Sequence, residues 1–188
     1  MIFKQETQIL KCTFEKEHFS KVKAAFKDRW PVVYIIEDDE KGQAYIGEST
    51  NICTRICDHW NNTERRALKN IYIIFNKVFN KSVILDLEAF LIGYIVADGK
   101  YRLQNGNGGQ HVHNYYLRDE YQREFRHIWQ LLQDEGVVRH GITLLENQDL
   151  FKYSPYKILN LDQFNVAVQI LTDLKYDLGN NNQSRSFI

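Results

Sequence analysis

Two short apolar runs in the first third of the chain constrain the fold most strongly. Residues 32–36 and 44–47 are rich in β-branched and aromatic side chains, whereas residues 37–43 between them are mostly polar and acidic and include Gly42. Apolar runs of this length, joined by a polar turn that contains glycine, are typical of a β-hairpin. The sequence therefore predicts two paired strands here.

Helical patterns surround this hairpin. Apolar residues recur at intervals of three and four in residues 15–27, 52–60, 83–96, 115–135 and 162–177, which predicts five amphipathic helices. Residues 70–75 have the β-branched and aromatic composition of a third strand. Residues 101–103 are predicted to form a short extended piece. Ser82 is the expected N-cap of the helix over residues 83–96. Up to that helix the predicted order is helix, strand, strand, helix, strand, helix.

Length and charge exclude several classes of protein. The chain has 188 residues, 44% of them hydrophobic, with only two prolines, so we expect one folded domain with at most a short appendage. Lys plus Arg and Asp plus Glu both total 24, so the net charge gives no support for binding to nucleic acid or to a membrane surface. A local excess does occur, because residues 63–81 hold five cationic side chains and one acidic one.

No window approaches the roughly 20 apolar residues of a membrane helix, and charges interrupt the first ten residues. We therefore expect a soluble, cytoplasmic protein without a membrane partner. Three cysteines, an odd number, favour a reducing compartment. A zinc site formed by Cys53, Cys57 and either His111 or His113 is a weaker alternative, because the C-x-x-C spacing of strong zinc signatures is absent.

Several side chains in the middle of the chain are candidates for catalysis. Tyr34 and Tyr45 lie in the two hairpin strands beside Gly47, although packing alone also explains tyrosines in strands. Arg55 and His59 are four residues apart and share one face of a helix. Arginine can grip a phosphate with two hydrogen bonds, and histidine can exchange a proton near neutral pH.

Glu88 lies on the apolar stripe of its predicted helix, so its carboxylate points toward the core side. An ionised carboxylate is costly to bury without a partner, which indicates a cation or a metal ion beside it. Arg55 is the competing structural partner. Asn105 opens a glycine-rich loop after this helix, where its amide can orient a neighbouring group. The glycines of that loop do not fit a phosphate-binding fingerprint.

In their order and spacing, these residues resemble the GIY-YIG endonucleases. The resemblance spans residues 31–109 and departs from the family signature in one respect, because Val32-Val33-Tyr34 stands where the family has Gly-Ile-Tyr. Asn107 is an alternative to Asn105 for the asparagine of the family. The residues that carry the resemblance are Tyr34, Tyr45, Gly47, Arg55, His59, Glu88 and Asn105.

The resemblance implies an α+β fold in which a small three-stranded antiparallel sheet is flanked by helices, with a helical C-terminal extension. It implies a nuclease domain over residues 31–135, between a helical lead-in (1–30) and a helical connector (136–188). A single active site would hydrolyse DNA, or alternatively RNA, with a divalent metal ion, Mg²⁺ or Mn²⁺.

Each candidate has a role that fits this expectation. Glu88 would hold the metal, and Arg55 would stabilise charge on the phosphate. Tyr34 would be the general base, at a cost of about 4 kcal/mol for its phenolate at pH 7 if its pKa is the ordinary one near 10. Tyr45 would position the phosphate, and His59 would assist or relay protons.

A second resemblance extends beyond these residues. Residues 79–82, 103–109, 113–116 and 151–156 are similar to the GIY-YIG subgroup fused to a DUF2075-type, superfamily 1 helicase-like ATPase. This implies the N-terminal nuclease portion of a larger bacterial nuclease-helicase, in DNA repair or phage defence, with the ATPase domain as a partner. Two alternatives stay open: a non-cleaving nucleic-acid-binding or regulatory module of the same fold, and a protein-interaction domain in which Glu88 merely pairs with Arg55.

Overall fold

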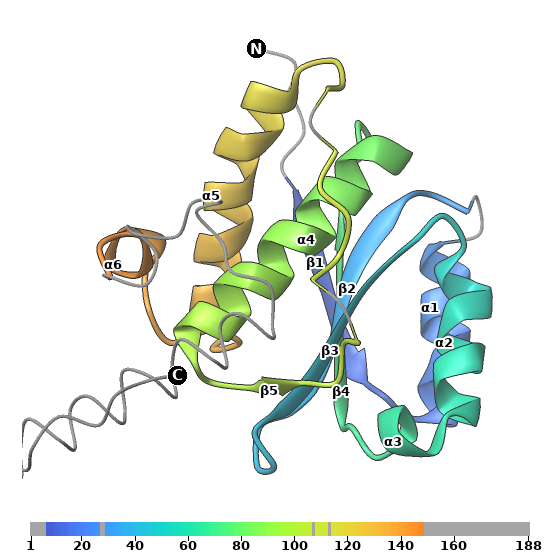
Figure 1. Cartoon of the computed structure of the whole chain (residues 1–188). Coiled ribbons are helices and arrows are strands. Elements are labelled where there is room, and N and C mark those ends of the chain that lie inside the picture. Colours follow the sequence, from blue (N-terminus) through green and yellow to red (C-terminus); the bar gives the residue numbers. More distant parts are fainter. Residues whose placement is uncertain (1–6, 27–28, 107, 113, 149–188) are drawn as a thin grey trace, which may run out of the picture.

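A mixed sheet of five strands forms the centre of the molecule (Figure 1). The computed structural model describes residues 7–26, 29–106, 108–112 and 114–148. The strand order is β1-β4-β2-β3-β5, and all neighbours are antiparallel except β3 and β5. The strands are β1 (Gln8–Thr13), β2 (Val32–Asp38), β3 (Gln43–Ser49), β4 (Asn70–Phe75) and β5 (Arg102–Leu103).

Helices cover both faces of this sheet, and Figure 1 shows α4 and α5 on one side and α1 and α2 on the other. The helices are α1 (Phe19–Ala25), preceded by a 3₁₀ turn over Lys16–His18, α2 (Ile52–Asn61), α3 (Thr63–Arg66), α4 (Lys81–Asp98), α5 (Arg118–Asp134) and α6 (Ile142–Glu146). Alternate residues of β2 point into opposite cores, Val33 and Ile35 toward α4, Val32, Tyr34 and Ile36 toward α1 and α2.

The predicted hairpin is confirmed, and its register places Tyr34 directly opposite Gly47. The predicted three-stranded sheet is wrong, because β1 and β5 are added at the two edges. Strand β1 lies within the predicted helical lead-in and pairs with β4 over six residue pairs. As an edge strand it has no fully buried residue, so it lacks the strong apolar run by which the inner strands are recognised.

Side-chain caps set the ends of the helices near the hairpin. The side chain of Asn51 caps α2, and that of Asn80 caps α4 by accepting a hydrogen bond from the Val83 N–H at 3.1 Å. The predicted cap Ser82 is therefore wrong, because the helix begins at Lys81, one residue before it. Helix α4 ends where Gly99 adopts a φ of +71° in the left-handed region, which favours glycine.

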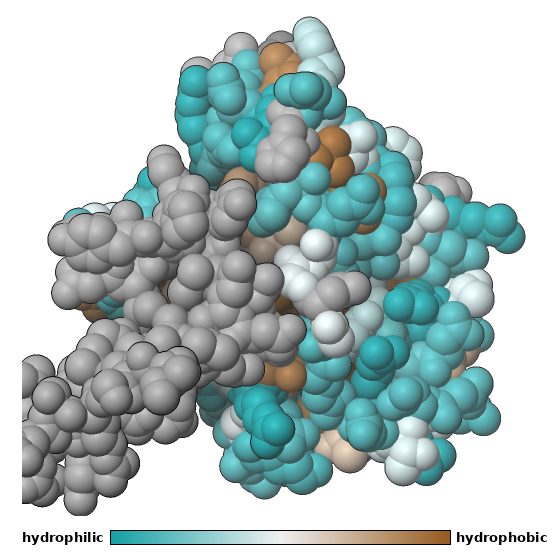
Figure 2. Space-filling view, viewed as in Figure 1, coloured by the Kyte–Doolittle hydropathy of each residue, from teal (hydrophilic) through white to brown (hydrophobic). Residues whose placement is uncertain are grey.

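None of the helices in the described part of the chain is long and apolar enough to cross a membrane. Hydrophilic side chains dominate the described surface on the face seen in Figure 2. The predicted helix over residues 162–177 and the motif over residues 151–156 lie outside the described residues, as do Asn107 and His113.

Candidate active site

The phenol of Tyr34 lies directly against the backbone of Gly47. A Cβ atom at position 47 would be 2.3 Å from the Tyr34 hydroxyl oxygen, much closer than any ordinary contact. The missing side chain of Gly47 therefore leaves room for the Tyr34 side chain, which is fully buried.

Two side chains of α2 converge on the Tyr34 hydroxyl. Arg55 Nε donates a hydrogen bond to the Tyr34 oxygen at 3.2 Å, and His59 Nε2 lies 2.6 Å from the same oxygen. Because Arg55 and His59 are four residues apart, successive turns of the helix present both to one point. The predicted shared face is therefore directed at Tyr34.

Tyr45 completes this cluster from β3. Its ring centroid lies 6.3 Å from that of Tyr34 and 4.8 Å from that of His59. All three rings are almost completely buried. The structure thus brings Tyr34, Tyr45, Arg55 and His59 into one cluster on the α2 side of the sheet.

Burial determines the protonation states in this cluster. It raises the pKa of Tyr34 above its ordinary range; neighbouring Tyr45 adds to this, whereas the hydrogen bond from Arg55 lowers the pKa. Burial also lowers the pKa of His59 to about 3, and the positive charges of Arg55 and Arg65 act in the same direction. At neutral pH both Tyr34 and His59 are therefore uncharged.

Asn105 fixes the strand that carries Tyr45 and Gly47. Its Oδ1 accepts a hydrogen bond from the Ile46 N–H at 3.0 Å, and its Nδ2 donates to the Ile46 carbonyl at 2.8 Å. Strand β5 pairs with β3 only at residues 43 and 44, so the buried amide of Asn105 takes over the role of a strand partner at Ile46. Its contacts are with the backbone of β3 between Tyr45 and Gly47.

Glu88 reaches the same edge of β3 from α4, on the other side of the sheet. Its side chain is partly buried. Burial raises the pKa of Glu88 to about 7, and the negative charge of Glu48 on β3 also raises it. The positive charges of Lys81 and Arg55 lower it, but by less. Glu88 is in turn close enough to Tyr34 to raise the pKa of the phenol. Glu88 is therefore coupled electrostatically to the Tyr34 cluster.

Glu48 is an acidic neighbour that sequence reasoning did not single out. Its Oε1 lies 2.5 Å from Lys81 Nζ, while its Oε2 is buried and has no hydrogen-bond partner among the described residues. The side chain is 17% exposed. Glu48 and Glu88 thus form a poorly solvated acidic pair.

The other acidic residues of α4 are satisfied by the protein itself. Asp86 is fully buried, and its carboxylate is bound by Tyr115, His111 and Arg118. Asp98 accepts hydrogen bonds from the backbone N–H groups of residues 139 and 140. No ion pair joins Glu88 to Arg55 within the described ranges, where Arg55 bonds to Tyr34 instead. Glu88 therefore differs from Asp86 and Asp98 in its surroundings.

The basic segment over residues 63–81 does not form one free cationic patch. Lys69 pairs with Glu40, and Lys81 pairs with Glu48. Arg65 turns inward, with Nη1 3.1 Å from His59 Nδ1 and its guanidinium carbon 4.0 Å from the Tyr45 ring centroid. Arg65 therefore belongs to the cluster, although the sequence pattern marked it only as surface charge.

The zinc alternative receives no support. Cys53 donates to the Phe26 carbonyl and Cys57 to that of Cys53, whereas His111 bonds to Asp86 on the opposite side of the sheet. In the part of the chain that the structure describes, no three His, Cys, Asp or Glu side chains are arranged to hold a metal ion.

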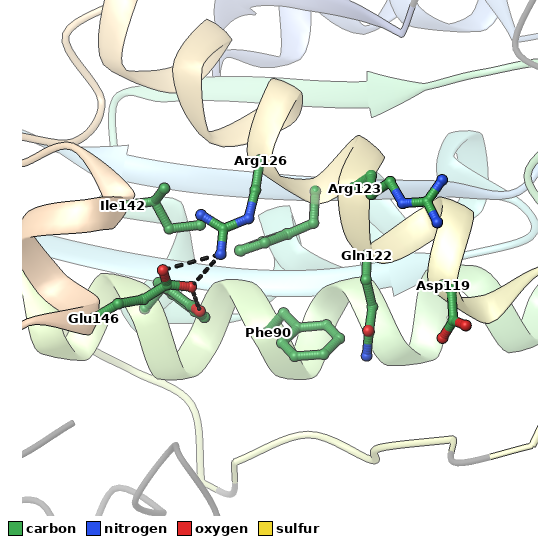
Figure 3. A pocket seen from close by; sticks show the side chains of 9 residues that line it. Phe90, Asp119, Gln122, Arg123, Arg126, Ile142 and Glu146 are labelled. Carbon is green, nitrogen blue, oxygen red and sulfur yellow. Dashed lines mark hydrogen bonds and ion pairs between the residues drawn. The ribbon is translucent and has the colours of Figure 1, made fainter. Parts of the chain in front are cut away.

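A separate hollow lies between α4, α5 and α6, on the face of the sheet away from Tyr34 (Figure 3). The Arg126 guanidinium, which bonds both Glu146 carboxylate oxygens, lies in this hollow beside Phe90. Tyr94 also donates to Glu146 at 3.0 Å. These contacts join α6 to α4 and α5, so the hollow is a feature of helix packing.

Comparison with known proteins supports the family expectation for the central part of the chain. No curated protein and no solved structure is significantly similar to the chain. Residues 31–102 match the family model of the GIY-YIG catalytic domain. The match includes Tyr34, Tyr45, Arg55, His59 and Glu88 and ends before Asn105. Residues 31–102 are thus similar to the GIY-YIG catalytic domain, the domain of a nuclease family.

Proposed function

We propose that this protein is a metal-dependent endonuclease that hydrolyses DNA phosphodiester bonds at the Tyr34 cluster. One observation carries the proposal. Arg55 and His59 both lie at hydrogen-bond distance from the Tyr34 hydroxyl, and Glu88 lies close enough to influence the pKa of Tyr34. A packing tyrosine needs no such set of partners.

Arg55 is the phosphate-binding group of this proposal. Its Nε is engaged by Tyr34, and its side chain is partly exposed. Its other guanidinium N–H groups can donate to a phosphate oxygen. Such donors stabilise the charge that develops on the phosphate in the transition state.

Tyr34 is the general base. Its oxygen lies at the meeting point of two N–H-bearing groups, an arrangement that favours a phenolate over a phenol. Because burial holds the phenol neutral in the free protein, Tyr34 would release its proton to solvent only once the metal ion and DNA are bound. The phenolate then accepts a proton from the attacking water.

Glu88 is the ligand of a divalent ion, and its surroundings fit one. Two carboxylates share this edge of β3, Glu48 has a buried oxygen without a partner, and the pKa of Glu88 is raised. Mg²⁺ is typically held by one or two carboxylates together with water and substrate phosphates, so a larger cluster of protein ligands is not required. When bound, the ion would offset charge on the phosphate.

Tyr45 and Asn105 position the reacting groups. Tyr45 lies beside Tyr34 and packs at a tilt against His59, and its hydroxyl can orient the phosphate. Asn105 acts through the backbone of Ile46, which it holds between Tyr45 and Gly47.

We further propose that the nuclease is the N-terminal portion of a larger nuclease-helicase. The support is the similarity of residues 79–82, 103–109, 113–116 and 151–156 to the subgroup fused to a DUF2075-type ATPase. The intact mass of the native gene product tests this, because a mass of about 22 kDa would contradict it.

Nicking of supercoiled plasmid tests the nuclease directly. We expect Mg²⁺ or Mn²⁺ to support cleavage by the wild type, and expect Glu88→Gln and Tyr34→Phe to abolish it. The matched controls are Glu64→Gln and Tyr116→Phe, at exposed positions away from the cluster. Metal-dependent nicking that survives both active-site substitutions contradicts the assignment, and binding without cleavage favours the non-cleaving module.

A further inference from the structure

We propose that Arg65 is a positioning residue that fixes the tautomer of His59, so that His59 donates a hydrogen bond to Tyr34 and does not take its proton. The hydrogen-bond pattern alone carries the tautomer assignment. Its catalytic meaning rests on the proposed nuclease function.

The assignment follows from which groups can donate. A guanidinium has only donors, and Arg65 Nη1 lies 3.1 Å from His59 Nδ1. Nδ1 must therefore be the acceptor of this pair and carry no hydrogen. A neutral imidazole has one N–H, which places it on Nε2, 2.6 Å from the Tyr34 oxygen.

A doubly protonated ring does not fit this pattern. It would carry a hydrogen on each nitrogen, so an N–H would face the N–H of Arg65. His59 has no exposed surface, and burial together with the charges of Arg55 and Arg65 lowers its pKa to about 3. The ring is therefore neutral under ordinary conditions, and Arg65 decides which nitrogen keeps the hydrogen.

The break between α2 and α3 makes this contact possible. On one continuous helix, residues six apart point in directions about 240° apart around the axis, so Arg65 would point away from His59. Helix α2 ends at Asn61, and the side chain of Asn62 caps α3 by accepting from the Arg65 N–H at 3.0 Å. The chain thereby turns back and presents Arg65 to His59.

A second contact holds the guanidinium in place. Its carbon lies 4.0 Å from the centroid of the Tyr45 ring, a favourable cation–π geometry. Arg65 therefore bridges two of the predicted active-site residues. This contact explains why a half-buried arginine is held here instead of extending into water.

The consequence is that the Tyr34 oxygen accepts two hydrogen bonds, one from Arg55 Nε and one from His59 Nε2. Two donors stabilise a phenolate. In the opposite tautomer, His59 Nε2 would accept a hydrogen bond from the phenol O–H and so stabilise the neutral phenol. Arg65 thus sets whether His59 supports or opposes the general base.

Nitrogen NMR of the full chain labelled with ¹⁵N-histidine tests this without any cleavage assay. Long-range ¹H–¹⁵N correlations distinguish a protonated from an unprotonated ring nitrogen. The set of signals that disappears in the His59→Gln variant is the one that belongs to His59. We expect the Nε2–H tautomer in the wild type. An Nδ1–H tautomer or a doubly protonated ring in the wild type at neutral pH overturns the inference.

The variant Arg65→Met and its matched control Arg66→Met remove one positive charge each from neighbouring positions of α3, and Arg66 is exposed. We expect Arg65→Met to shift His59 to a mixture of tautomers, while Arg66→Met keeps the wild-type pattern. An unchanged tautomer in Arg65→Met overturns the inference.

Cleavage is measured separately under single-turnover conditions. We expect Arg65→Met to lower the rate by about 10- to 100-fold, the effect of losing one hydrogen bond to a charged group, and Arg66→Met to leave it nearly unchanged. If the wild type does not cleave, the proposed function fails while the NMR result still decides the tautomer. If the tautomer shifts and the rate does not, the positioning role is contradicted and the nuclease stands.

Discussion

Gly47 and Tyr34 face each other across the β2–β3 pair, so a methyl group at position 47 would overlap the phenol. Tyr34 cannot swing aside freely, because it is fully buried and bonded to Arg55. We expect Gly47→Ala to displace Tyr34, to cost about 1–3 kcal/mol of stability, and to lower the cleavage rate by about 100-fold. Urea unfolding and single-turnover cleavage measure the two effects.

The matched control is Gly106→Ala. A Cβ atom there meets nothing within 4 Å, so both stability and cleavage should stay close to those of the wild type. Wild-type activity in Gly47→Ala would show that the position of Tyr34 does not matter.

The raised pKa of Glu88 predicts a pH-dependent cost of folding. Its pKa is about 7 in the folded protein against an ordinary value of 4.5, so the folded state holds the proton more tightly. This contribution is fully favourable below pH 4.5 and is lost as pH rises through about 7. Because Glu88 is partly exposed and solvent screens its charge, the loss is about 2 kcal/mol or less. Without metal, Glu88→Gln should therefore be more stable than the wild type at pH 8, with a smaller difference at pH 4.5.

Urea unfolding in EDTA at the two pH values measures this, with Glu64→Gln as the control at an exposed position. Equal stability of Glu88→Gln and the wild type at pH 8 would contradict the raised pKa. Added Mn²⁺ should then stabilise the wild type but not Glu88→Gln, since ligands that bind only the folded state stabilise it.

At the scale of residues, spacing predicted that Arg55 and His59 share a helix face and that Tyr34 and Tyr45 lie in paired strands. Only the family resemblance placed these two pairs in one site. The sequence did not predict Arg65, since its contact with His59 depends on the break at Asn62. Burial on an apolar helix was also not enough to single out Glu88 as the candidate metal ligand. Asp86 on the same helix is more deeply buried, and its carboxylate is bound by other side chains. Only the tertiary structure separates the two acids.

Asn105 stabilises β3 as an element, because it provides both hydrogen bonds of the Ile46 peptide where β5 has ended. We expect Asn105→Ala to leave the Ile46 N–H and C=O unpaired and to cost about 2 kcal/mol. Amide hydrogen exchange at Ile46 should become faster relative to that of Ile35 on β2. Cleavage should fall because Tyr45 and Gly47 flank Ile46.

Asn147→Ala is the control for this change. The Asn147 amide also donates to a backbone carbonyl, that of Thr143, but at an exposed position, so the loss should be small. Unchanged exchange at Ile46 in Asn105→Ala would contradict the role of Asn105 as a substitute strand partner.

The elements with strong patterns were predicted from the sequence, and the weak ones were not. The strand over residues 70–75 and the helix over residues 52–60 match β4 and α2 closely, since each combines a clear apolar pattern with a polar boundary. Strand β1 was not predicted, because an edge strand needs no continuous apolar face. Residues 101–103 were predicted only as an extended piece and not as a strand of the sheet, because β5 is two residues long. Both depend on partners distant in the sequence.

At the scale of the whole molecule, the described part of the chain presents one Tyr34 cluster, on the face of the sheet that α2 covers. A single hydrolytic site cuts one strand per encounter. We expect supercoiled plasmid to become nicked first and linear only later, with the two steps separated in time. Gel analysis of a time course measures this, and linear product without a nicked intermediate would indicate two sites acting together.

The charge balance of the molecule predicts modest electrostatic attraction to DNA. The net charge is zero, and Lys69 and Lys81 are engaged by acidic partners. Affinity for DNA should therefore fall only gently with salt, since the slope follows the number of phosphates that the protein neutralises. Equilibrium binding of the Glu88→Gln variant at several salt concentrations measures the slope, and a steep dependence would indicate a larger basic surface.

The crystal structure of the Tyr34→Phe variant with a DNA duplex and Mn²⁺ tests the central claim most directly, because anomalous scattering locates the ion. The account predicts an ion bound to the Glu88 carboxylate, with a DNA phosphate between it and Arg55 and with residue 34 facing that phosphate. An ion bound elsewhere while Glu88 stays unliganded, or a duplex that lies away from Arg55, would contradict it.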